Sequence, residues 1–387
     1  MRSNTLIAPL ELETREVFPK RQRNGHSEET PQSKTTTLLV GFDWGTNKSC
    51  VQTSLAGSSE TLLDTVVPTI VGYANDGIVD HLLPGNARRL FGAEALKHRL
   101  HVRLVQPMID GVVDDLSAAR DFAGHIRSLI QAPDEAEVRA VIGLPANAER
   151  AARENLRQAV AGVFDKVIMI PEPFLAALGY RDEARLQDPA YVDPVSNSLF
   201  VDIGGGTTDV CLVQGYFPTA DDQISLPFAG DKVDALLGEA IKKTYPDLSL
   251  SALKAREIKE QYSYVGKLES PVVVNLVVGG KVCKFDLGSQ IGEACAELLE
   301  RILGAVKTLI GRASSDSVLE LLRNIILTGG GSRVQGLAAE LQRRLTEEGY
   351  EKPCVQSVGE NYKQFVARGA LKAARQAKET QWQQLIA

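Results

Sequence analysis

Two short turns rich in glycine and threonine constrain this chain more than any other feature. The first is FDWGTNKS (42–49) and the second is VDIGGGTTD (201–209). In each, a hydrophobic segment ends in an aspartate, Asp43 or Asp202, and the turn leads straight back into another hydrophobic segment. Because glycine-rich turns present backbone N–H groups that bind anions, two copies of one turn predict two related halves that hold a phosphate-bearing ligand between them.

The residue types in both turns suit a nucleotide with a bound magnesium ion. Glycine has no Cβ, so its backbone can approach a phosphate oxygen closely; the glycines concerned are Gly45, Gly204, Gly205 and Gly206. The side chains expected to donate hydrogen bonds to phosphate are those of Thr46, Asn47, Thr207 and Thr208. Asp43 and Asp202 are expected to face Mg²⁺, which takes one or two carboxylates together with waters and phosphate oxygens. Either turn alone is more often simply a turn, so the prediction depends on finding both.

Composition limits the function further. At 387 residues, of which 44% are hydrophobic, the chain has the length and composition of a globular protein of two domains. Its net charge of −6 offers no basic face for nucleic acid. No two of the five cysteines are spaced as a Cys-x-x-Cys pair. This spacing is typical of free thiols in a reducing compartment, and it argues against a zinc site. The sequence has neither a hydrophobic run of the ~18–20 residues that a membrane-spanning helix needs nor a signal peptide at its start, so we expect a cytoplasmic protein.

Residues 1–35 are polar, with a basic stretch KRQRNGH (20–26) and an exit rich in proline, serine and threonine. We expect a flexible tail there. An alternative is a short amphipathic segment that binds a membrane or a partner, since hydrophobic residues recur between Leu6 and Phe18. Pro9 and three glutamates inside that segment argue against this alternative.

Beyond the tail, short strand-like segments alternate with helical patterns, which is typical of an α/β fold. Residues 149–164 read as an amphipathic helix and residues 288–311 as a long helix. The polar, proline-bearing segment 181–198 reads as the connection between the two halves. A hairpin in the second half is expected to turn at Gly279 and Gly280.

A third glycine-rich motif, LTGGGSRVQGL (327–337), leaves a strand-like segment and enters a helical one. Gly329, Gly330 and Gly331 would again allow the backbone to approach a ligand. The motif is not the GxxxxGK[ST] phosphate loop, because no Lys-Ser/Thr follows, and it is not a dinucleotide GxGxxG motif. By itself the motif is typical of an ordinary strand-to-helix turn. It supports a ligand-binding site only in combination with the two hairpin turns.

Glu172 stands between Pro171 and Pro173 at the start of a helical pattern. A following proline holds a residue in an extended conformation, so the carboxylate should project from the end of a strand. Enzymes that transfer phosphoryl groups mainly position the reacting groups, and one carboxylate that orients a water is enough. The local sequence supports equally well a carboxylate that only stabilises the helix N-terminus.

The segment REIKEQYSYVG (256–266) reads as a charged helix. Lys259 and Glu260 are adjacent, so they diverge on a helix and can reach a ribose from one edge. A solvent-exposed charged helix is the commoner explanation of such a string.

The order FDWGTN, IPEPFLAALG, VDIGGGTTD, REIKEQYSYVG and LTGGGSRVQGL resembles the order of the five motifs of the actin-like ATPase superfamily. The resemblance covers about residues 36–375, and the compact length is similar to that of the bacterial actins. Segments such as QPMIDGVVDD and DDQISLPFAGDKVD resemble most the bacterial actins of magnetosome chains, and next those that determine cell shape.

The resemblance implies an α/β architecture, the actin-like ATPase fold, with two related halves and four subdomains around a nucleotide cleft. Subdomain IA is expected over residues 36–66 and 104–185 with a C-terminal helix at 361–387, and subdomain IB over 67–103. Subdomain IIA is expected over 198–225 and 296–360, and subdomain IIB over 226–295.

The resemblance also implies cofactors and residue roles. ATP and Mg²⁺ would bind in the cleft, with Asp43 and Asp202 placed around the metal and contacting it through water. Glu172 and Asp202 would be the catalytic residues, and Lys259 and Glu260 would contact ribose and adenine. The adenosine cradle would consist of Gly329, Gly330, Gly331, Ser332 and Arg333.

Two residues of the first turn depart from the family's pattern. Phe42 and Trp44 are larger than the aliphatic residues usual at these positions. We expect them to add bulk near the phosphates and to alter turnover.

The first hypothesis for function is a cytoskeletal ATPase that polymerises with ATP, disassembles after hydrolysis and positions an organelle of the magnetosome type. A head-to-tail contact that does not close on itself produces filaments, so the main partner would be the chain itself, with organelle- or membrane-associated adaptor proteins as further partners. The alternative is a small-metabolite or sugar kinase of the same fold, which needs a carboxylate base at a second substrate pocket; the sequence offers no motif for one. The sequence does not decide between ATP and GTP, because a site lined by glycine backbone discriminates poorly between adenine and guanine.

Overall fold

The structure is a computed structural model, and it describes residues 36–133, 135–268 and 270–384. The tail predicted over residues 1–35 lies outside the described residues. The described part of the chain is built on two large β-sheets, each of which carries one of the two glycine-rich hairpins.

The first large sheet has its strands in the order β18-β10-β9-β1-β2-β3. These are β1 (Thr37–Trp44), β2 (Lys48–Leu55), β3 (Leu63–Pro68), β9 (Glu137–Leu144), β10 (Lys166–Pro171) and β18 (Gln383–Gln384). β1 and β2 form an antiparallel hairpin that pairs Asp43 with Cys50, while β1, β9 and β10 run parallel. Side chains of β1 alternate between two hydrophobic clusters, with Leu38 and Phe42 in one and Leu39 in the other, because successive strand residues point to opposite faces.

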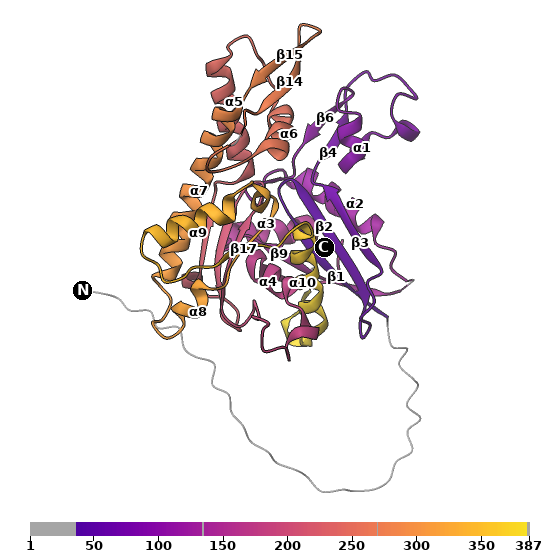
Figure 1. The fold of residues 1–387 in the computed structure, drawn as a ribbon. Helices are drawn as coiled ribbons and strands as arrows, with labels where there is room; N and C mark the ends of the chain where they lie inside the picture. The colour runs from indigo at the N-terminus through magenta and orange to yellow at the C-terminus, as the bar shows by residue number, and fades with distance from the viewer. Residues whose placement is uncertain (1–35, 134, 269, 385–387) are drawn as a thin grey trace, which may run out of the picture. The chain divides into compact units, whose positions relative to one another are not determined.

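The second large sheet has the order β13-β12-β11-β16-β17. Its strands are β11 (Ser198–Ile203), β12 (Thr208–Val213), β13 (Gln223–Leu226), β16 (Ile325–Thr328) and β17 (Val355–Ser357). The β11–β12 hairpin pairs Asp202 with Asp209, and β11, β16 and β17 run parallel. Both sheets therefore join a hairpin and an antiparallel third strand to two parallel strands, which confirms the predicted α/β fold of two related halves (Figure 1). We call residues 36–180 with 361–384 the first half and residues 198–360 the second half.

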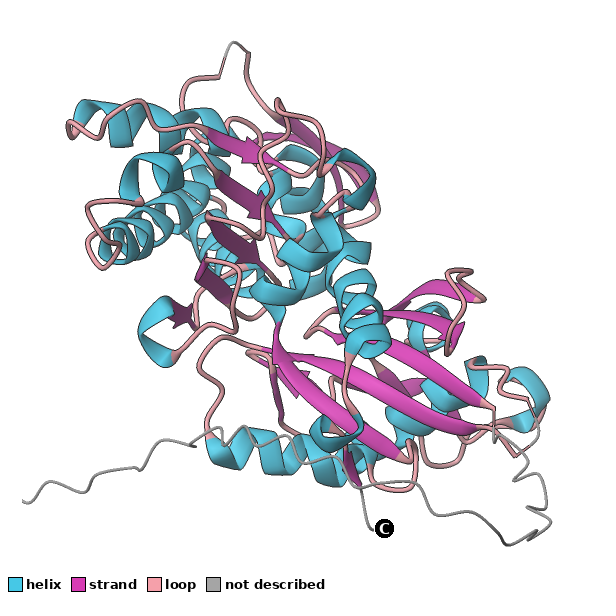
Figure 2. Ribbon diagram, turned by 90° about the horizontal axis from the view of Figure 1, so that it is seen from below, coloured by secondary structure: helices cyan, strands magenta, loops and turns pink. Residues whose placement is uncertain are grey.

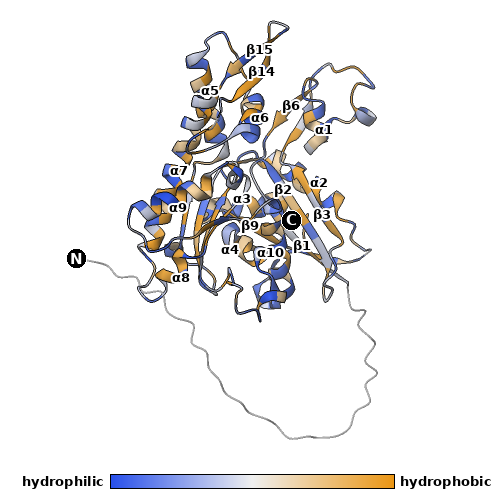
Figure 3. Ribbon diagram, in the orientation of Figure 1, coloured by the Kyte–Doolittle hydropathy of each residue, from blue (hydrophilic) through white to orange (hydrophobic). Residues whose placement is uncertain are grey.

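Helices cover both sheets, and Figure 2 shows the strands in two groups with helices on either side. The first half contains α1 (Gly92–Lys97), α2 (Leu116–Leu129), α3 (Arg150–Val160), α4 (Glu172–Tyr180) and α10 (Tyr362–Gln376). The second half contains α5 (Gly230–Thr244), α6 (Ala252–Tyr262), α7 (Gly288–Ile310), α8 (Val318–Leu322) and α9 (Leu337–Glu347). α3 and α7 confirm the two helices expected from the sequence. Figure 3 shows helices with hydrophilic and hydrophobic sides, as expected when each helix buries one face.

α4 and α10 cross in direct backbone contact, and α4 contacts strands of both sheets. A Cβ on Gly179 would lie 1.9 Å from the carbonyl oxygen of Phe365, and a Cβ on Gly369 would lie 1.8 Å from that of Leu175. Any side chain at either glycine would push the two helices apart. The crossing thus fixes Glu172, the first residue of α4, relative to the start of α10.

Smaller strands lie outside the two large sheets. They are β4 (Val71–Ala74), β5 (Arg89–Phe91), β6 (Val102–Val105), β7 (Met108–Ile109), β8 (Val112–Val113), β14 (Val273–Val278) and β15 (Lys281–Asp286). Gly279 and Gly280, both with positive φ (55° and 81°), form the turn between β14 and β15, as predicted. β4 and β5 lie in the segment predicted as subdomain IB, and β6 crosses its predicted end at residue 103. β14 and β15 lie in the segment predicted as subdomain IIB; the division into four subdomains stays a prediction.

The C-terminal segment extends the first sheet. β18 pairs antiparallel with β10 and matches Gln383 with Val167. Next to it, Arg139 of β9 forms an ion pair with Glu379 at 2.6 Å, and its guanidinium lies over the ring of Trp382 at 5.6 Å from the centroid. Charge pairing and a cation–π contact therefore hold this short strand on the sheet.

Candidate functional site

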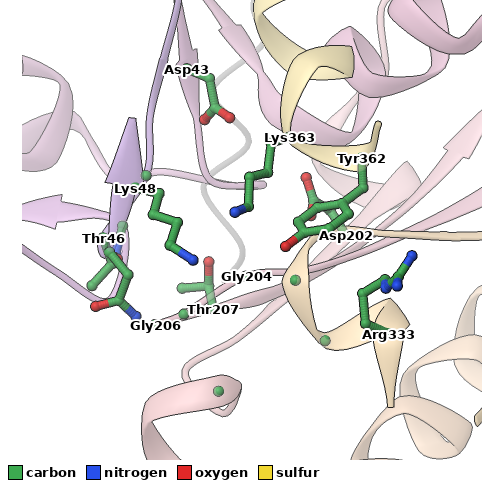
Figure 4. Close-up of a pocket in the computed structure, with 18 of the residues that line it drawn as sticks. Asp43, Thr46, Lys48, Asp202, Gly204, Gly206, Thr207, Arg333, Tyr362 and Lys363 are labelled. Atoms are coloured by element: carbon green, nitrogen blue, oxygen red, sulfur yellow. The ribbon is translucent and has the colours of Figure 1, made fainter. Parts of the chain in front are cut away.

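The two hairpin turns, the third glycine motif and parts of α4, α6 and α10 line one cavity of about 380 Å³. This volume is within the range of small-molecule sites, roughly 300–1,000 Å³. The predicted site residues that line it are Asp43, Gly45, Thr46, Asn47, Glu172, Asp202, Gly204, Gly205, Gly206, Thr207, Lys259, Glu260, Gly329, Gly330, Gly331 and Arg333. They come from both halves, so the cavity lies between the halves (Figure 4).

Two of the predicted residues do not line the cavity. The hydroxyl of Thr208 donates to the carbonyl oxygen of Phe228 at 2.8 Å, and Thr208 is fully buried. The hydroxyl of Ser332 donates to the carbonyl oxygen of Gly329 at 2.8 Å. Both side chains therefore stabilise the turns from behind, whereas the sequence predicts that they contact the ligand.

The two glycine-rich hairpin turns, 42–49 and 201–209, are called the phosphate turns after the ligand that the sequence predicts, and they pack directly against each other. A Cβ on Gly205 would lie 2.1 Å from the side-chain nitrogen of Asn47, and a Cβ on Gly206 would lie 2.8 Å from the hydroxyl oxygen of Thr46. From the sequence, these glycines are explained by the approach of phosphate. The structure adds a second reason, because the opposite turn leaves no room for a side chain.

Three side chains that are predicted to donate to phosphate already form hydrogen bonds within the protein. Thr46 accepts a hydrogen bond at its hydroxyl oxygen from the backbone N–H of Gly111 at 3.0 Å. The hydroxyl of Thr207 donates to Oδ2 of Asp209 at 2.8 Å. Asn47 donates across the cavity to the second half, as described below. Contact of these three side chains with phosphate stays a prediction.

The third glycine motif packs on the second hairpin. Gly329 has a φ of 77°, and a Cβ there would lie 2.4 Å from Oδ1 of Asp202. A Cβ on Gly331 would lie 2.1 Å from the side chain of Ile203. Gly330 by contrast has only the ring of Tyr362 nearby, at 3.9 Å. Gly330 is therefore the position of this turn that leaves its backbone accessible from the cavity.

Four carboxyl groups are gathered beside the turns, and the pKa of each is raised. Burial raises the pKa of Asp202 to about 7 and that of Asp209 to about 6. Burial, and then the charge of Asp202, hold the pKa of Asp43 well above its usual range. Burial, followed by the charges of the three aspartates, does the same for the pKa of Glu172. So many buried carboxylates favour a cation in their midst.

Mg²⁺ fits this donor set. Within the described ranges, no group of three or more His, Cys, Asp or Glu side chains is arranged to hold a metal ion. Mg²⁺ keeps several waters and binds through one or two carboxylates and substrate phosphates. Asp43 and Asp202 both line the cavity and are close enough for the charge of Asp202 to raise the pKa of Asp43, so they are the residues that would supply those carboxylates.

Glu172 lies where the sequence predicts it, at the junction of β10 and α4. Its side chain reaches the cavity and passes so close to Gly143 of β9 that a Cβ on this glycine would lie 2.8 Å from its Cγ. Tight packing beside a strand end restricts the carboxylate to one direction. A carboxylate restricted in this way suits the role predicted for Glu172, which is to orient a water molecule.

The two charged residues predicted on α6 both line the cavity. Nζ of Lys259 donates to the carbonyl oxygen of Gly230 at 2.8 Å and lies 2.8 Å from Oδ1 of Asp234. Glu260 lies 3.7 Å from Nζ of Lys48 on the opposite half. Lys259 is thus held by the second half, and Glu260 faces the first half across the cavity.

Sequence reasoning missed four charged or aromatic residues that line the cavity: Lys48, Arg256, Tyr362 and Lys363. Lys48 and Lys363 point toward one another in Figure 4. Burial lowers the pKa of Lys48, Glu260 opposes this effect, and Lys363 lowers the pKa further. Arg256 could have been found, because it precedes Lys259 and Glu260 by three and four residues and so shares their helix face. Tyr362 and Lys363 begin α10 and carry no motif.

Phe42 and Trp44 do not add bulk near the phosphate turn, and that prediction was wrong. Both rings are buried, and their centroids lie 5.1 Å apart in a stack. Trp44 also stacks on Phe122 of α2 at 6.0 Å. Because strand side chains alternate between faces, both rings point into the core while Asp43 between them points into the cavity.

The helices of the described segments include none that is both long enough and apolar enough to cross a membrane.

Comparison with known proteins agrees with this geometry. Residues 40–381 match the family described as MreB/Mbl protein. The chain is 29% identical to the actin-like protein MamK of Magnetospirillum gryphiswaldense, over 94% of this chain and 96% of that protein. It is 30% identical to the actin-like protein MamK of Paramagnetospirillum magneticum, over 90% of this chain and 95% of that protein.

Solved structures show the same relationship. The fold is similar to that of a MamK double helical filament, with a TM-score of 0.79, 29% identity and coverage of 88% of this chain and 100% of that chain. It is also similar to a non-polymerising MamK mutant bound to AMPPNP, with a TM-score of 0.62, 29% identity and coverage of 88% and 99%. The chain therefore belongs to the MreB/Mbl family of actin-like proteins, and the predicted similarity to MamK is confirmed.

Proposed function

We propose that this protein is an ATPase that assembles into filaments of copies of itself and uses ATP hydrolysis to control their turnover. The observation that carries the proposal is the cavity lined jointly by both phosphate turns, the third glycine motif and Glu172. A solved MamK structure that this chain resembles is a double helical filament, and another is bound to AMPPNP, which supports both parts of the proposal.

The phosphates would bind against the two turns, where backbone N–H groups can bind anions. The N–H of Gly204 donates to the carbonyl oxygen of Thr207 at 2.9 Å, so in the second turn the N–H groups of Gly205 and Gly206 are the ones proposed to bind phosphate. Asp43 and Asp202 would hold Mg²⁺ through water, and Asp202 would count among the catalytic residues for that reason. Bound there, the ion neutralises charge that develops on the phosphate oxygens. Lys48 and Lys363, which converge on the same space, add positive charge on the side of the first half.

Glu172 is proposed to orient the attacking water. It lines the cavity with the phosphate turns, and its backbone is held by the crossing of α4 and α10. In phosphoryl transfer, positioning and electrostatic stabilisation supply most of the catalysis. One correctly placed carboxylate therefore suffices for the hydrolytic step.

The nucleoside is proposed to lie between α6 and the third glycine motif. Lys259 and Glu260 would contact the ribose and the adenine. Gly329, Gly330, Gly331 and Arg333 would form the cradle, with Ser332 stabilising the turn from behind.

In the cell, the filaments are proposed to lie in the cytoplasm and to position an internal structure of the magnetosome type, with adaptor proteins as further partners. The relatives named MamK support this role. The alternative of a small-metabolite kinase is not favoured, because the matched relatives are actin-like proteins over nearly their full length.

Sedimentation tests the proposal. The purified protein is centrifuged with Mg²⁺-ATP, with Mg²⁺-ADP and with ATP plus EDTA, and the pellets are viewed by negative-stain electron microscopy. We expect filaments with Mg²⁺-ATP and far fewer with EDTA. A protein that stays a small oligomer under all three conditions over a range of salt concentrations would overturn the proposal.

A further inference from the structure

A hydrogen-bonded network joins the first phosphate turn to two helices of the second half. Nδ2 of Asn47 donates to Oδ1 of Asp231 at 2.7 Å, and Nη1 of Arg256 donates to Oδ1 of Asn47 at 2.9 Å. Nη2 of Arg256 lies 2.9 Å from the same Oδ1 of Asp231, so each of the three side chains contacts the other two. Gln106 of the first half also donates to Oδ1 of Asn47, at 3.1 Å.

The network is anchored within the second half. Nε of Arg256 donates to Oδ2 of Asp234 at 3.1 Å, and the side chain of Asp234 is only 6% exposed. The backbone N–H of Asp231 donates to the carbonyl oxygen of Gly205 at 2.8 Å. Because Gly205 belongs to the second phosphate turn and Asn47 to the first, the network connects the two turns through Asp231.

The chemistry of the three side chains explains why these residue types are needed. The amide of Asn47 supplies a donor to Asp231 and an acceptor to Arg256 at the same time. The planar guanidinium of Arg256 presents several N–H groups at fixed angles, so it can bond one amide and two carboxylates together. Hydrogen bonds to charged groups are also the stronger ones, above all away from water; the side chains of Arg256 and Asp231 are 27% and 29% exposed.

We propose that Asn47, Asp231 and Arg256 form a latch across the cavity, which positions the two phosphate turns around the nucleotide and sets the rate at which the nucleotide leaves. The proposal rests on the proposed nucleotide binding. Release of a ligand held between the turns requires the turns to separate, and separation breaks the bonds of Asn47 to Asp231 and to Arg256. Arg256 is a positioning residue, since it acts through Asn47 and Asp231.

Nucleotide dissociation gives the direct test. The fluorescent analogue mant-ATP is bound in the presence of Mg²⁺ and chased with excess ATP in a stopped-flow instrument. Asn47→Ala and Arg256→Ala should each raise the dissociation rate by about tenfold, because each removes charge-assisted hydrogen bonds of ordinary strength. Arg256→Lys should fall between the wild type and Arg256→Ala, because one ammonium group cannot bridge all three partners.

The double variant Asn47→Ala/Arg256→Ala separates a latch from two independent effects. If the residues act together, the double variant dissociates no faster than the faster single variant. Multiplication of the two single effects would overturn the proposal, and so would a wild-type rate in either single variant. Arg343→Ala is the matched control, because Arg343 forms ion pairs with Glu340 and Glu347 of its own helix α9 and does not line the cavity.

A second measurement does not need nucleotide binding. Hydrogen exchange of the nucleotide-free protein is followed in the peptides that cover residues 43–50 and 229–235. Asn47→Ala should exchange faster than the wild type in both peptides. Unchanged exchange in 229–235 would overturn the latch, because this peptide contains Asp231, the partner of Asn47 in the second half. If mant-ATP fails to bind even the wild type, the proposed function fails instead, and the latch is judged from hydrogen exchange alone.

Discussion

The backbone N–H of Ala146 donates a hydrogen bond to Oδ1 of Asp209 at 3.1 Å. Ala146 follows β9 in the first half, and Asp209 lies on β12 in the second half, so this bond crosses between the halves. The other oxygen of Asp209 accepts from the hydroxyl of Thr207. One buried carboxylate thereby ties the second phosphate turn to the opposite half.

Replacement of Asp209 tests this tie. Asp209→Ala leaves the buried N–H of Ala146 without its acceptor. At about pH 4, where the raised pKa of Asp209 keeps its carboxyl protonated and the variant removes no buried charge, we expect a loss of about 1–3 kcal/mol in the free energy of unfolding. Asp209→Asn should lose less, because its amide oxygen can still accept from Ala146 and the hydroxyl of Thr207 can turn to accept from the amide nitrogen. Urea unfolding of the three proteins measures the difference. Equal losses in both variants would contradict the role of the bond.

The raised pKa of Asp202 predicts how stability depends on pH. With a pKa of about 7 in the folded protein against about 3.9 in an unfolded chain, Asp202 binds its proton more tightly when folded. This tighter proton binding stabilises the folded protein, and the stabilisation is fully present below about pH 4 and is lost as the pH rises toward 7. Asp202→Asn removes this loss, so without Mg²⁺ and nucleotide the variant should be more stable than the wild type at pH 8, by roughly 1–4 kcal/mol.

The check is the difference in unfolding free energy between Asp202→Asn and the wild type, measured with urea from about pH 4 to about pH 8. The difference should grow with pH in favour of the variant. A constant difference would mean that Asp202 is not the titrating group. The same variant should lose Mg²⁺-dependent ATP hydrolysis, and unchanged hydrolysis would refute its catalytic role.

Glu172→Ala should separate assembly from hydrolysis. Without the carboxylate that orients water, we expect phosphate release to slow by about a hundredfold or more, while nucleotide binding and filament formation continue. Filaments of the variant should then persist after wild-type filaments have disassembled. Phosphate release and sedimentation followed on one sample show both effects, with Glu154→Ala on the exposed side of α3 as the control. Normal phosphate release in Glu172→Ala would remove the role that we assign to it.

At the crossing of α4 and α10, we expect a Gly→Ala substitution to destabilise the folded protein, although the same substitution usually stabilises a helix. In an exposed helix interior, Gly→Ala stabilises by roughly 0.4–1 kcal/mol, and Gly304 of α7, whose added methyl group would meet no neighbouring atom within 4 Å, should follow this rule. Gly179→Ala should instead destabilise by about 1–3 kcal/mol or more, because its methyl group would overlap the backbone of α10. Thermal unfolding of both variants gives the comparison, and a stabilising Gly179→Ala would contradict the close packing.

Lys363 should strengthen nucleotide binding through its charge. Lys48 and Lys363 converge inside the cavity (Figure 4), and an anion between them relieves their repulsion. Lys363→Ala should therefore raise the Kd for ATP by about tenfold at low salt, and by less at high salt, where charge is screened. Titration at two ionic strengths measures this, with the exposed Lys352→Ala as the control. An equal loss at both ionic strengths would assign Lys363 a packing role.

The sequence predicted those parts of the site that depend on short-range chemistry. The turns after Asp43 and Asp202 and the junction at Glu172 were found, because glycine, proline and strand-terminal aspartate restrict the backbone locally. Lys363 was missed for the opposite reason, since only the packing of α10 on the first sheet brings it to the cavity.

Other errors had the same origin in tertiary contacts. The direction of Trp44 depends on which face of β1 meets α2, and strand periodicity alone does not give that. The role of Asn47 depends on Asp231 and Arg256, which lie far away in the sequence. The residue types in the motifs thus predicted which residues line the cavity. The hydrogen-bond partner of each side chain could be identified only from the three-dimensional structure.

The short strand β18 has a consequence for assembly. By pairing with β10 it occupies backbone groups at an edge of the first sheet, and unpaired edges are templates for the addition of strands from other molecules. If the protein assembles into ordered filaments as proposed, it must also avoid amyloid-like growth at high local concentration. Loss of the contacts that hold β18, such as that of Arg139 with Trp382, should therefore divert the protein from filaments toward disordered aggregates.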